Sequence, residues 1–405
     1  MQRGRVFSER QDGLGPWANG RCKRGEGLRA PEDGLGCFSE GLRSARQPST
    51  RPHDSAVNAR SAPRKIVIAK AGSYDRLRVE PIAAPRPGPN EVVIDVRASG
   101  VNYADVIVRM GLYASAKELV GWPITPGFEV AGIVRAVGAE VKDLEVGARV
   151  FAVTLFGGYA SVLAVPRHQV FALPESLDFT QGAALPAVFL TAHFALRFLA
   201  HPRPGDRVLV HSAAGGVGGN LVQLAKLDGC EVTGVVGGTH KVEAARALGC
   251  DHVIDKSRED LWRRAEQISA RGFDVVLDAN GVATLKGSYE HLRPAGKLVV
   301  YGFATMMPKT GGRPNYLKLA ADYLRTPRFN PLDLTNQSKS VLAFNLSYLF
   351  DRDDILREGM AELATLLGQG ELVPPAVTTY PLDEVARAHR DIESGRTIGK
   401  LVLLP

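Results

Sequence analysis

The sequence has 405 residues, of which 45% are apolar and 23% charged, a composition typical of globular proteins and long enough for about two or three domains. Its net charge of +7 is concentrated in residues 1–64, which carry 12 basic and 7 acidic side chains, so the remaining chain is nearly neutral and nucleic-acid binding is not expected. No apolar run approaches the roughly 20 residues of a membrane span, so stable membrane insertion is not expected either.

Residues 1–63 are predicted to be a disordered tail, because they are rich in Arg, Gly, Ser and Pro and lack hydrophobic periodicity. They contain no apolar region of a secretory signal, and their acidic residues argue against a transit peptide. Whether they are a functional tail or precede the true start stays open. The four cysteines, Cys22, Cys37, Cys230 and Cys250, form no C-x-x-C pair. This favours a reducing, cytoplasmic location over a disulfide or cysteine–zinc framework.

The first predicted domain covers residues 64–188, where short alternating apolar segments are separated by Gly and Pro. Such a pattern is typical of a small β-rich domain. Strands are expected at Lys65–Ala69, Glu91–Val96, Ala131–Val137 and Arg149–Val153. Between Asp178 and Ala200, apolar residues at helical spacing predict two helices that lead into the next domain.

The second predicted domain, residues 189–350, alternates strands with helices, which indicates a doubly wound parallel sheet of the Rossmann type. Its strands are expected at Val208–His211, Thr233–Val236, Val253–Ile254, Asp274–Asp278, Lys297–Tyr301 and Val341–Asn345. Residues 351–405 are expected to return to the first domain. They should form a helix at Asp353–Gln369, a strand at Val377–Tyr380, a helix at Leu382–Glu393 and a strand at Lys400–Leu404. An α/β protein built in this way has a cleft between its domains, where small ligands bind.

The strongest functional signal is a strand, a glycine turn and a helix between Arg207 and Asn220. Gly215 suits a tight turn beside a pyrophosphate, Gly216 adds room, and Gly218 lets the helix lie close to its strand. The helix N-terminus offers free N–H groups and a partial positive charge to phosphates. Because an alanine replaces the first glycine of the strict fingerprint, a purely structural turn stays an alternative. Dinucleotide contacts are predicted for Ala214, Gly215, Gly216, Val217 and Gly218.

The predicted cofactor is NADPH. NAD sites place an acidic residue about 20 residues after the glycines, but Val235–Lys241 contains none. A free hydroxyl on Thr239 and the ammonium of Lys241 suit a 2′-phosphate instead. One charge-assisted phosphate contact contributes about 1.5–3 kcal/mol, so we expect NADPH to be preferred over NADH by at least ~10-fold.

Several motifs together resemble the medium-chain dehydrogenase/reductase superfamily, in its zinc-free quinone oxidoreductase branch, and are most similar to the synaptic vesicle amine transport protein group. The resemblance covers residues 64–405 and rests on Ala98–Asp105, Arg109–Tyr113, Thr125–Gly132, Ala213–Gly218 and Asn345–Leu349. It implies a GroES-like catalytic domain beside the Rossmann domain. It also implies a homodimer formed through edge strands, with Val341–Tyr348 as the candidate segment.

A metal site is not expected. Zinc-dependent relatives have Cys where this chain has Asn102 and a Gly-His-Glu sequence where it has Gly127-Phe128-Glu129. Catalytic zinc needs three protein ligands, and of these positions Glu129 alone remains a suitable one. Without a Lewis acid, the favoured chemistry is hydride transfer to a quinone or an α,β-unsaturated carbonyl, which delocalises the incoming charge itself.

The resemblance implies that Asn102 and Tyr113 line the nicotinamide and substrate cleft. Asn102 would orient cofactor or substrate. Tyr113 either hydrogen-bonds the substrate carbonyl and relays a proton, or packs as an aromatic wall. Cofactor contacts are implied for Thr191, Gly302 and Phe303 near the nicotinamide and for Lys256, which either meets the 2′-phosphate or is a solvated surface lysine.

Two further polar residues are expected to be structural: Asp105, which should satisfy local backbone donors, and His211, which should pack inside the first Rossmann strand. The substrate wall is expected from the loops Tyr113–Trp122 and Thr305–Arg313. Two alternatives to a quinone or enone reductase stay open. One is an enoyl or alkenal reductase acting on a longer chain. The other is a non-enzymatic NADPH-binding protein associated with lipid or membrane.

Overall fold

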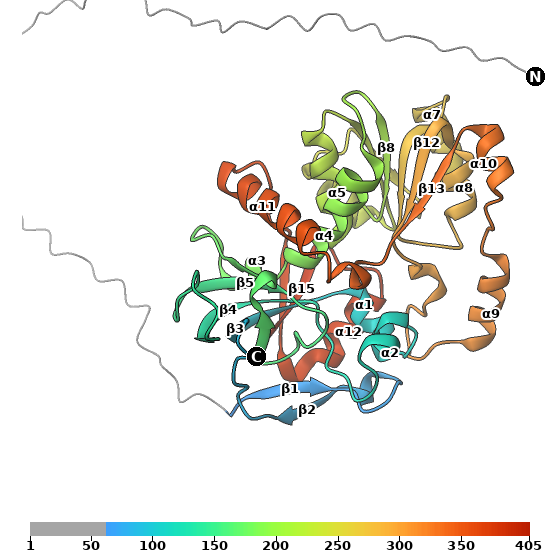
Figure 1. Cartoon of the computed structure of the whole chain (residues 1–405). Coiled ribbons are helices and arrows are strands. Elements are labelled where there is room, and N and C mark those ends of the chain that lie inside the picture. Colours follow the sequence, from blue (N-terminus) through green and yellow to red (C-terminus); the bar gives the residue numbers. More distant parts are fainter. Residues whose placement is uncertain (1–61) are drawn as a thin grey trace, which may run out of the picture. The chain divides into compact units, whose positions relative to one another are not determined.

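The computed structural model describes residues 62–405. The predicted tail, residues 1–63, lies outside these residues except for its last two positions. Residues 62–405 form one compact unit organised around two large sheets (Figure 1).

The first large sheet has seven strands and is mainly antiparallel. Its order is β14-β15-β3-β4-β5-β7, and β6 also pairs with β3. The strands are β3 (Glu91–Val101), β4 (Glu129–Val137), β5 (Arg149–Val153), β6 (Val162–Pro166), β7 (Val170–Ala172), β14 (Val377–Pro381) and β15 (Lys400–Leu404). A two-stranded ribbon, β1 (Arg64–Val67) and β2 (Arg78–Pro81), accompanies it. Since β15 pairs with β3, strands from both ends of the described chain complete one sheet.

The second sheet has six parallel strands in the order β10-β9-β8-β11-β12-β13. The strands are β8 (Arg207–His211), β9 (Glu231–Val236), β10 (His252–Asp255), β11 (Phe273–Asp278), β12 (Leu292–Val300) and β13 (Ser340–Ala343). This is the Rossmann order, which confirms the predicted fold class. The strand order reverses between β8 and β11, where such sheets bind ligands beyond the carboxyl ends of their strands.

The helices are α1 (Tyr103–Arg109), α2 (Ala114–Leu119), α3 (Phe179–Gly182), α4 (Pro186–His193), α5 (Gly216–Leu227), α6 (Val242–Ala247), α7 (Leu261–Ile268), α8 (Leu285–Glu290), α9 (Tyr316–Arg325), α10 (Pro331–Gln337), α11 (Asp353–Gln369) and α12 (Val385–Glu393). The helices α9 and α10 follow β12 and lie along one side of the parallel sheet in Figure 1. Sequence analysis gave no prediction for either helix.

A single large apolar core joins the two sheets. It includes Phe151 and Val153 of β5, Phe189 of α4, and Val208 and Leu221 of the Rossmann part. The helical run 179–200 has the length and hydropathy of a membrane span, but 78% of its apolar 18-residue window is buried inside the protein. The prediction that no apolar run approaches the length of a membrane span was therefore wrong. Polar residues such as Thr180 and Gln181 interrupt this run, so it does not stand out as a continuous apolar stretch in the sequence. Its burial is what a core helix requires.

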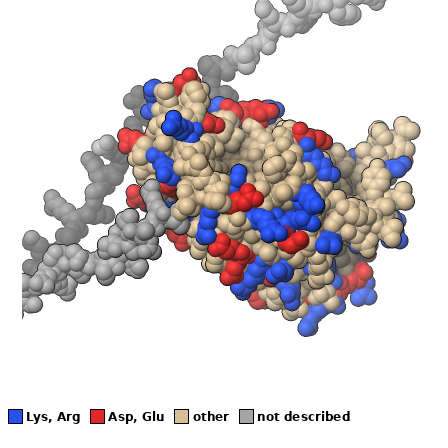
Figure 2. Space-filling model, turned by 90° about the horizontal axis from the view of Figure 1, so that it is seen from below, with Lys and Arg blue, Asp and Glu red and all other residues tan. Residues whose placement is uncertain are grey.

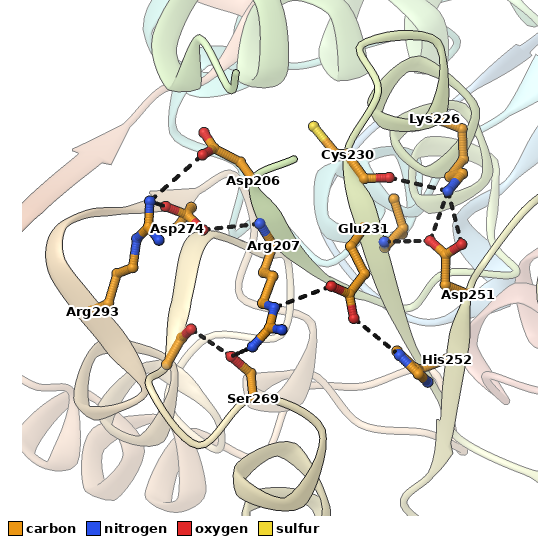
Figure 3. Close-up of polar contacts among 12 residues, drawn as sticks. Asp206, Arg207, Lys226, Cys230, Glu231, Asp251, His252, Ser269, Asp274 and Arg293 are labelled. Carbon is orange, nitrogen blue, oxygen red and sulfur yellow. Dashed lines mark hydrogen bonds and ion pairs between the residues drawn. The ribbon is translucent and has the colours of Figure 1, made fainter. Parts of the chain in front are cut away.

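Polar contacts fix the amino ends of the parallel strands (Figure 3). The Arg207 backbone N–H donates to Asp274 at 2.9 Å, and the Arg207 side chain donates to Glu231 at 3.1 Å. Lys226 pairs with Asp251 at 2.8 Å. These contacts hold β8, β9 and β11 together at one edge, so the opposite, carboxyl edge remains for ligands.

Candidate functional site

The glycine turn joins β8 to α5 at the carboxyl edge of the parallel sheet. Gly215 is the extended N-cap of α5, with φ −92° and ψ 175°. The left-handed residue of the turn is Ser212, at φ +58°, whose hydroxyl donates to Asn280 Oδ1 at 3.3 Å.

The other glycines of the turn allow close packing. A Cβ on Gly218 would lie 2.2 Å from the Ser212 carbonyl oxygen, so α5 can approach β8 only with glycine there. A Cβ on Gly216 would lie 3.0 Å from a methyl group of Val188 in α4. Ala214 and Val217 complete the turn, and the Ala214 carbonyl accepts a bond from the Gly399 N–H at 3.0 Å. The first turn of α5 thus presents its backbone N–H groups at the carboxyl edge, an arrangement that suits an anion.

Two lysines gather where β9 and β10 end. Burial, and then the charge of Lys256, lowers the pKa of Lys241. Burial, and then the charge of Lys309, lowers the pKa of Lys256. Lys241 donates to the Gly395 carbonyl at 2.6 Å, and within residues 62–405 neither Lys241 nor Lys256 has an ion pair with a carboxylate. The crowded positive charges suit a phosphate group.

The hydroxyl of Thr239 is not free, which corrects the sequence prediction. It donates to Asp255 Oδ2 at 2.7 Å. The reason is the parallel pairing of β9 with β10, which brings the end of β10 beside the residues that follow β9. A carboxylate therefore does lie near the predicted phosphate position, although it is engaged by Ser257 and Thr239.

The backbone of Gly395 and Arg396 also lies at this place, which the sequence did not predict. The Arg396 carbonyl oxygen lies 2.9 Å from the His240 ring, and the preceding Gly395 accepts the bond from Lys241. The hydrogen-bond partners of Gly395 and Arg396, Lys241 and His240, lie more than 150 positions away in the chain, so no local sequence pattern could predict these contacts.

The ends of β11 and β12 supply the next part of the cleft. Asn280 is buried, and its Nδ2 has no hydrogen-bond partner in the described part of the chain. A Cβ on Gly302 would lie 2.8 Å from the Ala279 carbonyl oxygen, so the backbone at Gly302 lies close to the backbone at Ala279. Phe303 is 41% exposed and packs over Gly281. A buried donor without a partner at the switch point fits a polar ligand such as a ribose or phosphate.

Asn102 belongs to a buried polar cluster with Glu129 and Lys400. Asn102 Nδ2 donates to Glu129 Oε1 at 2.8 Å, and Lys400 Nζ donates to Asn102 Oδ1 at 2.5 Å. Lys400 also forms an ion pair with Glu129 at 2.5 Å, and the Ala187 N–H donates to the other Glu129 oxygen. The side chains of Lys400 and Glu129 are 3% and 0% exposed. Glu129 is therefore engaged by an ammonium and two amide donors, an arrangement unlike that of a metal ligand.

Tyr113, the N-cap of α2, has aromatic neighbours around its ring and polar neighbours at its hydroxyl. Its ring packs edge-on against Phe128 and Phe156, with centroids 5.9 and 6.3 Å away. Its hydroxyl donates to Asn345 Oδ1 at 2.9 Å and lies 3.1 Å from Ser347 Oγ. Burial raises the pKa of Tyr113, which keeps the hydroxyl protonated. The sequence analysis named Asn345 and Ser347 only within the motif Asn345–Leu349 and predicted no contact with Tyr113.

Other predicted residues lie nearby in supporting roles. Thr191 is in α4, and its hydroxyl donates to the Ala187 carbonyl at 2.7 Å. Asp105 accepts bonds from the Asn102 and Gly127 N–H groups and from Tyr159, which agrees with the structural role expected for it. His211 is fully buried and lies 3.0 Å from Ser288 Oγ, as a packed imidazole should.

Comparison with known proteins gives the family. An alcohol dehydrogenase GroES-like domain matches residues 88–175, and a zinc-binding dehydrogenase domain matches residues 248–403. The human synaptic vesicle membrane protein VAT-1 homolog is 35% identical over 345 residues, which cover 84% of this chain and 86% of that protein. The chain belongs to the medium-chain dehydrogenase/reductase superfamily.

Two oxidoreductases of the superfamily are also similar. A 2-haloacrylate reductase from a Burkholderia species is 33% identical over 344 residues, which cover 84% of this chain and 98% of the enzyme. The solved structure of Escherichia coli quinone oxidoreductase complexed with NADPH has a TM-score of 0.74 and 30% identity. It covers 84% of this chain and 100% of that chain. These similarities place this superfamily member in the zinc-free quinone oxidoreductase branch, near VAT-1, and thus among oxidoreductases.

Lys400 was not predicted as a site residue, because only the fold brings it close to the glycine turn and to Asn102. Lys400 begins β15, and Gly399 just before it is bridged to Gly215 of the glycine turn. A Cβ on Gly216 would lie 3.6 Å from Lys400 Cδ. The lysine stem thus lies along the start of α5 while its ammonium reaches Asn102, so Lys400 connects the nucleotide turn to the catalytic sheet.

Proposed function

We propose that this protein is an NADPH-dependent, zinc-independent reductase that transfers hydride to quinones or α,β-unsaturated carbonyl compounds. The observation that carries the proposal is the pair of cations that follow β9 and β10, the partly exposed Lys241 and the exposed Lys256, neither of which has a carboxylate partner within residues 62–405. A phosphate on the ribose would neutralise this charge.

The residues present fit NADPH along the edge of the sheet. The N-terminus of α5 suits the pyrophosphate, and the buried Nδ2 of Asn280 lacks an acceptor that a ribose or phosphate oxygen would supply. Lys241, Lys256 and Arg396 would hold the 2′-phosphate. Thr191, Gly302 and Phe303 would border the nicotinamide. When bound, the cofactor supplies the hydride.

The proposed acceptor is a planar conjugated molecule. Tyr113, Phe128 and Phe156 form an aromatic cluster, with 5.0 Å between the ring centroids of Phe128 and Phe156. Zinc-dependent relatives have a metal-binding His at position 128. An aromatic wall in place of a metal favours an acceptor that spreads incoming negative charge over its own π-system.

Two side chains of this protein would act on that acceptor. The Tyr113 hydroxyl donates its single proton to Asn345 Oδ1 and would exchange this bond for one to the carbonyl oxygen that gains negative charge. Asn102, with its Oδ1 engaged by Lys400, keeps one N–H of its amide for cofactor or substrate.

The experiment is a turnover assay of the full chain with NADPH and a panel of benzoquinones, naphthoquinones and small enones, followed by NADPH absorbance. NADH is the cofactor control. We expect turnover with at least one class and a preference for NADPH of at least ~10-fold. NADPH binding without turnover on any acceptor would refute the reductase and favour the non-enzymatic alternative. No binding of either nucleotide would refute the whole proposal.

A second candidate is an enoyl or alkenal reductase for a longer chain. The observation that favours it is an exposed apolar group at the end of α2 and just after it, on the predicted substrate wall: Leu119, Val120 and Trp122. A series of 2-alkenals of rising length would discriminate the two. An efficiency that rises steadily with chain length favours this candidate, and a preference for quinones favours the first.

A further inference from the structure

Arg109 is a buried cation that the proposed function does not use. It is the last residue of α1 and the first of the motif Arg109–Tyr113. On the face of the molecule seen in Figure 2, Lys and Arg side chains lie at the surface beside Asp and Glu. Arg109 differs from them, because its side chain is 0% exposed and forms an ion pair with the equally buried Glu393 of α12. Burial of such a pair is costly unless further hydrogen bonds satisfy the remaining donors, so the other partners of Arg109 indicate its role.

The N–H groups of Arg109 reach several separate segments. Nε donates to the Gly72 carbonyl at 3.3 Å, and one terminal nitrogen lies 3.2 Å from Nδ1 of the His389 ring. The other terminal nitrogen donates to the Gly312 carbonyl at 3.2 Å. The guanidinium also lies over the Tyr74 ring, 4.4 Å from its centroid. Burial, and then the charge of Arg109, lowers the pKa of His389, so its ring is neutral and can accept. One side chain thus joins α1, α12 and the loop that follows β12.

The loop of residues 304–313 connects the cofactor edge to Arg109. It follows Phe303, which is expected to border the nicotinamide, and the Ala304 carbonyl accepts a bond from Tyr103 Oη at 3.3 Å. Tyr103 begins α1, and farther along the loop Met307 is buried in an apolar cluster with side chains of this helix. The loop therefore leaves the parallel sheet and continues along a helix of the other domain. It is also the loop from which part of the substrate wall is expected.

The tip of the loop fits tightly against the residues that follow β1. Gly312 has φ +65°, and a Cβ on it would lie 2.6 Å from a ring carbon of Tyr74 and 2.8 Å from Ser73 Oγ. The neighbouring Gly311 has φ +84°, but a Cβ there would meet nothing within 4 Å among the described residues. The Gly311 carbonyl accepts a bond from Ser73 Oγ at 3.2 Å. Of the two glycines, the one in close contact is thus Gly312, whose carbonyl Arg109 binds.

We propose that Arg109 is a positioning residue for the acceptor, because it holds the loop 304–313 in place as one wall of the substrate site, a role that rests on the proposed reductase function. The same guanidinium nitrogen that pairs with Glu393 donates to Gly312, so the tip of the loop is fixed to the buried ion pair. Release of the tip would let this wall move away from the acceptor, and small displacements of this kind lower catalytic efficiency strongly. NADPH would be affected less, because Lys241 and the start of α5 would hold its phosphates.

The test compares Gly312→Ala with Gly311→Ala in the full chain. Both variants place alanine at a positive φ and so share the backbone strain, but Gly312→Ala also pushes against Tyr74 and displaces the carbonyl from Arg109. With the best acceptor of the turnover panel, we expect the acceptor KM of Gly312→Ala to exceed that of Gly311→Ala at least about tenfold. Their NADPH Kd values should agree within about twofold. Gly370→Ala, at the C-cap of α11 with φ +71°, controls for strain elsewhere and should match the unaltered protein.

A second measurement needs no turnover. Trypsin can cut after the exposed Lys309 when the loop opens, and the cleavage rate reports the open fraction. We expect the fragment that ends at Lys309 to form at least about tenfold faster in Gly312→Ala and in Arg109→Lys than in Gly311→Ala. The Arg109→Lys variant keeps a charge for Glu393 but lacks the planar fork of donors that also reaches the loop.

Ser73→Ala is a milder variant that removes a single exposed hydrogen bond to the loop, so its folding is secure, and it should raise the cleavage rate roughly threefold. The proposal is overturned if Gly312→Ala and Gly311→Ala have the same acceptor KM. It is also overturned if neither Gly312→Ala nor Arg109→Lys is cut faster. Absence of turnover in the unaltered protein would instead refute the proposed function and with it the role toward the acceptor, and the cleavage rates would then still decide whether Arg109 holds the loop.

Discussion

Replacing Lys400 with Met should destabilise the protein strongly while leaving its backbone conformation intact. The ammonium is 3% exposed and lies 2.5 Å from the Glu129 carboxylate, which is fully buried. Methionine fills a similar volume but leaves the carboxylate with the Asn102 and Ala187 N–H donors alone. Breaking a buried ion pair by removing one partner costs about 3–5 kcal/mol, because the remaining charge stays desolvated.

The double variant Lys400→Met/Glu129→Gln separates this electrostatic effect from lost packing. Glutamine has nearly the shape of glutamate but carries no charge, so no uncompensated charge remains buried. We expect the double variant to recover about 2 kcal/mol or more of the lost free energy of unfolding, measured by urea unfolding followed by circular dichroism. The argument is refuted if the single Lys400→Met variant loses less than about 1 kcal/mol, or if the double variant is no more stable than the single one.

Further predictions concern the cofactor, the acceptor and assembly. Lys241→Ala should lower kcat/KM with NADPH at least about tenfold and leave NADH within about twofold; equal losses with both would contradict a phosphate contact. Burial lowers the pKa of Lys241 and Lys256, so both side chains lose their positive charge at a lower pH than an ordinary lysine does. The ratio of NADPH to NADH affinity should therefore fall as the pH rises from about 7 to about 9.5. A ratio that does not change with pH would contradict the proposed contact between these lysines and the phosphate. Tyr113→Phe should reduce turnover at least about tenfold with an unchanged NADPH Kd, and full activity would leave Tyr113 a packing residue. Light scattering should give a homodimer through the edge strand β13, whereas a pure monomer would exclude it.

Sequence periodicity predicted some elements to the residue. The strand Arg149–Val153, the helix Asp353–Gln369 and the strand Lys400–Leu404 have the bounds that were expected. Each is a local pattern, with apolar residues at the spacing of its element and a turn at its ends. The six-stranded parallel sheet followed from the alternation of such patterns.

The errors lie where contacts are distant in the chain. The hydroxyl of Thr239 was expected to be free in a stretch, Val235–Lys241, that contains no carboxylate, yet β10 brings Asp255 to it. Lys400 was taken as the start of a strand, while its acceptor Asn102 lies 298 positions earlier. The exposure of Leu317 and Leu324 on α9 could not be predicted, since a periodic apolar stripe does not reveal which side of a helix faces the core.

The pairing of β15 with β3 has a consequence for folding during synthesis. All six strands of the parallel sheet lie between residues 207 and 343, so that sheet can assemble as soon as this stretch has left the ribosome. The antiparallel sheet cannot close until residues 400–404 are made, although β3 and β4 emerge hundreds of residues earlier. Until then β3 exposes the edge that β15 will cover, and this interval is when the nascent protein is most open to incorrect strand pairing and to capture by chaperones.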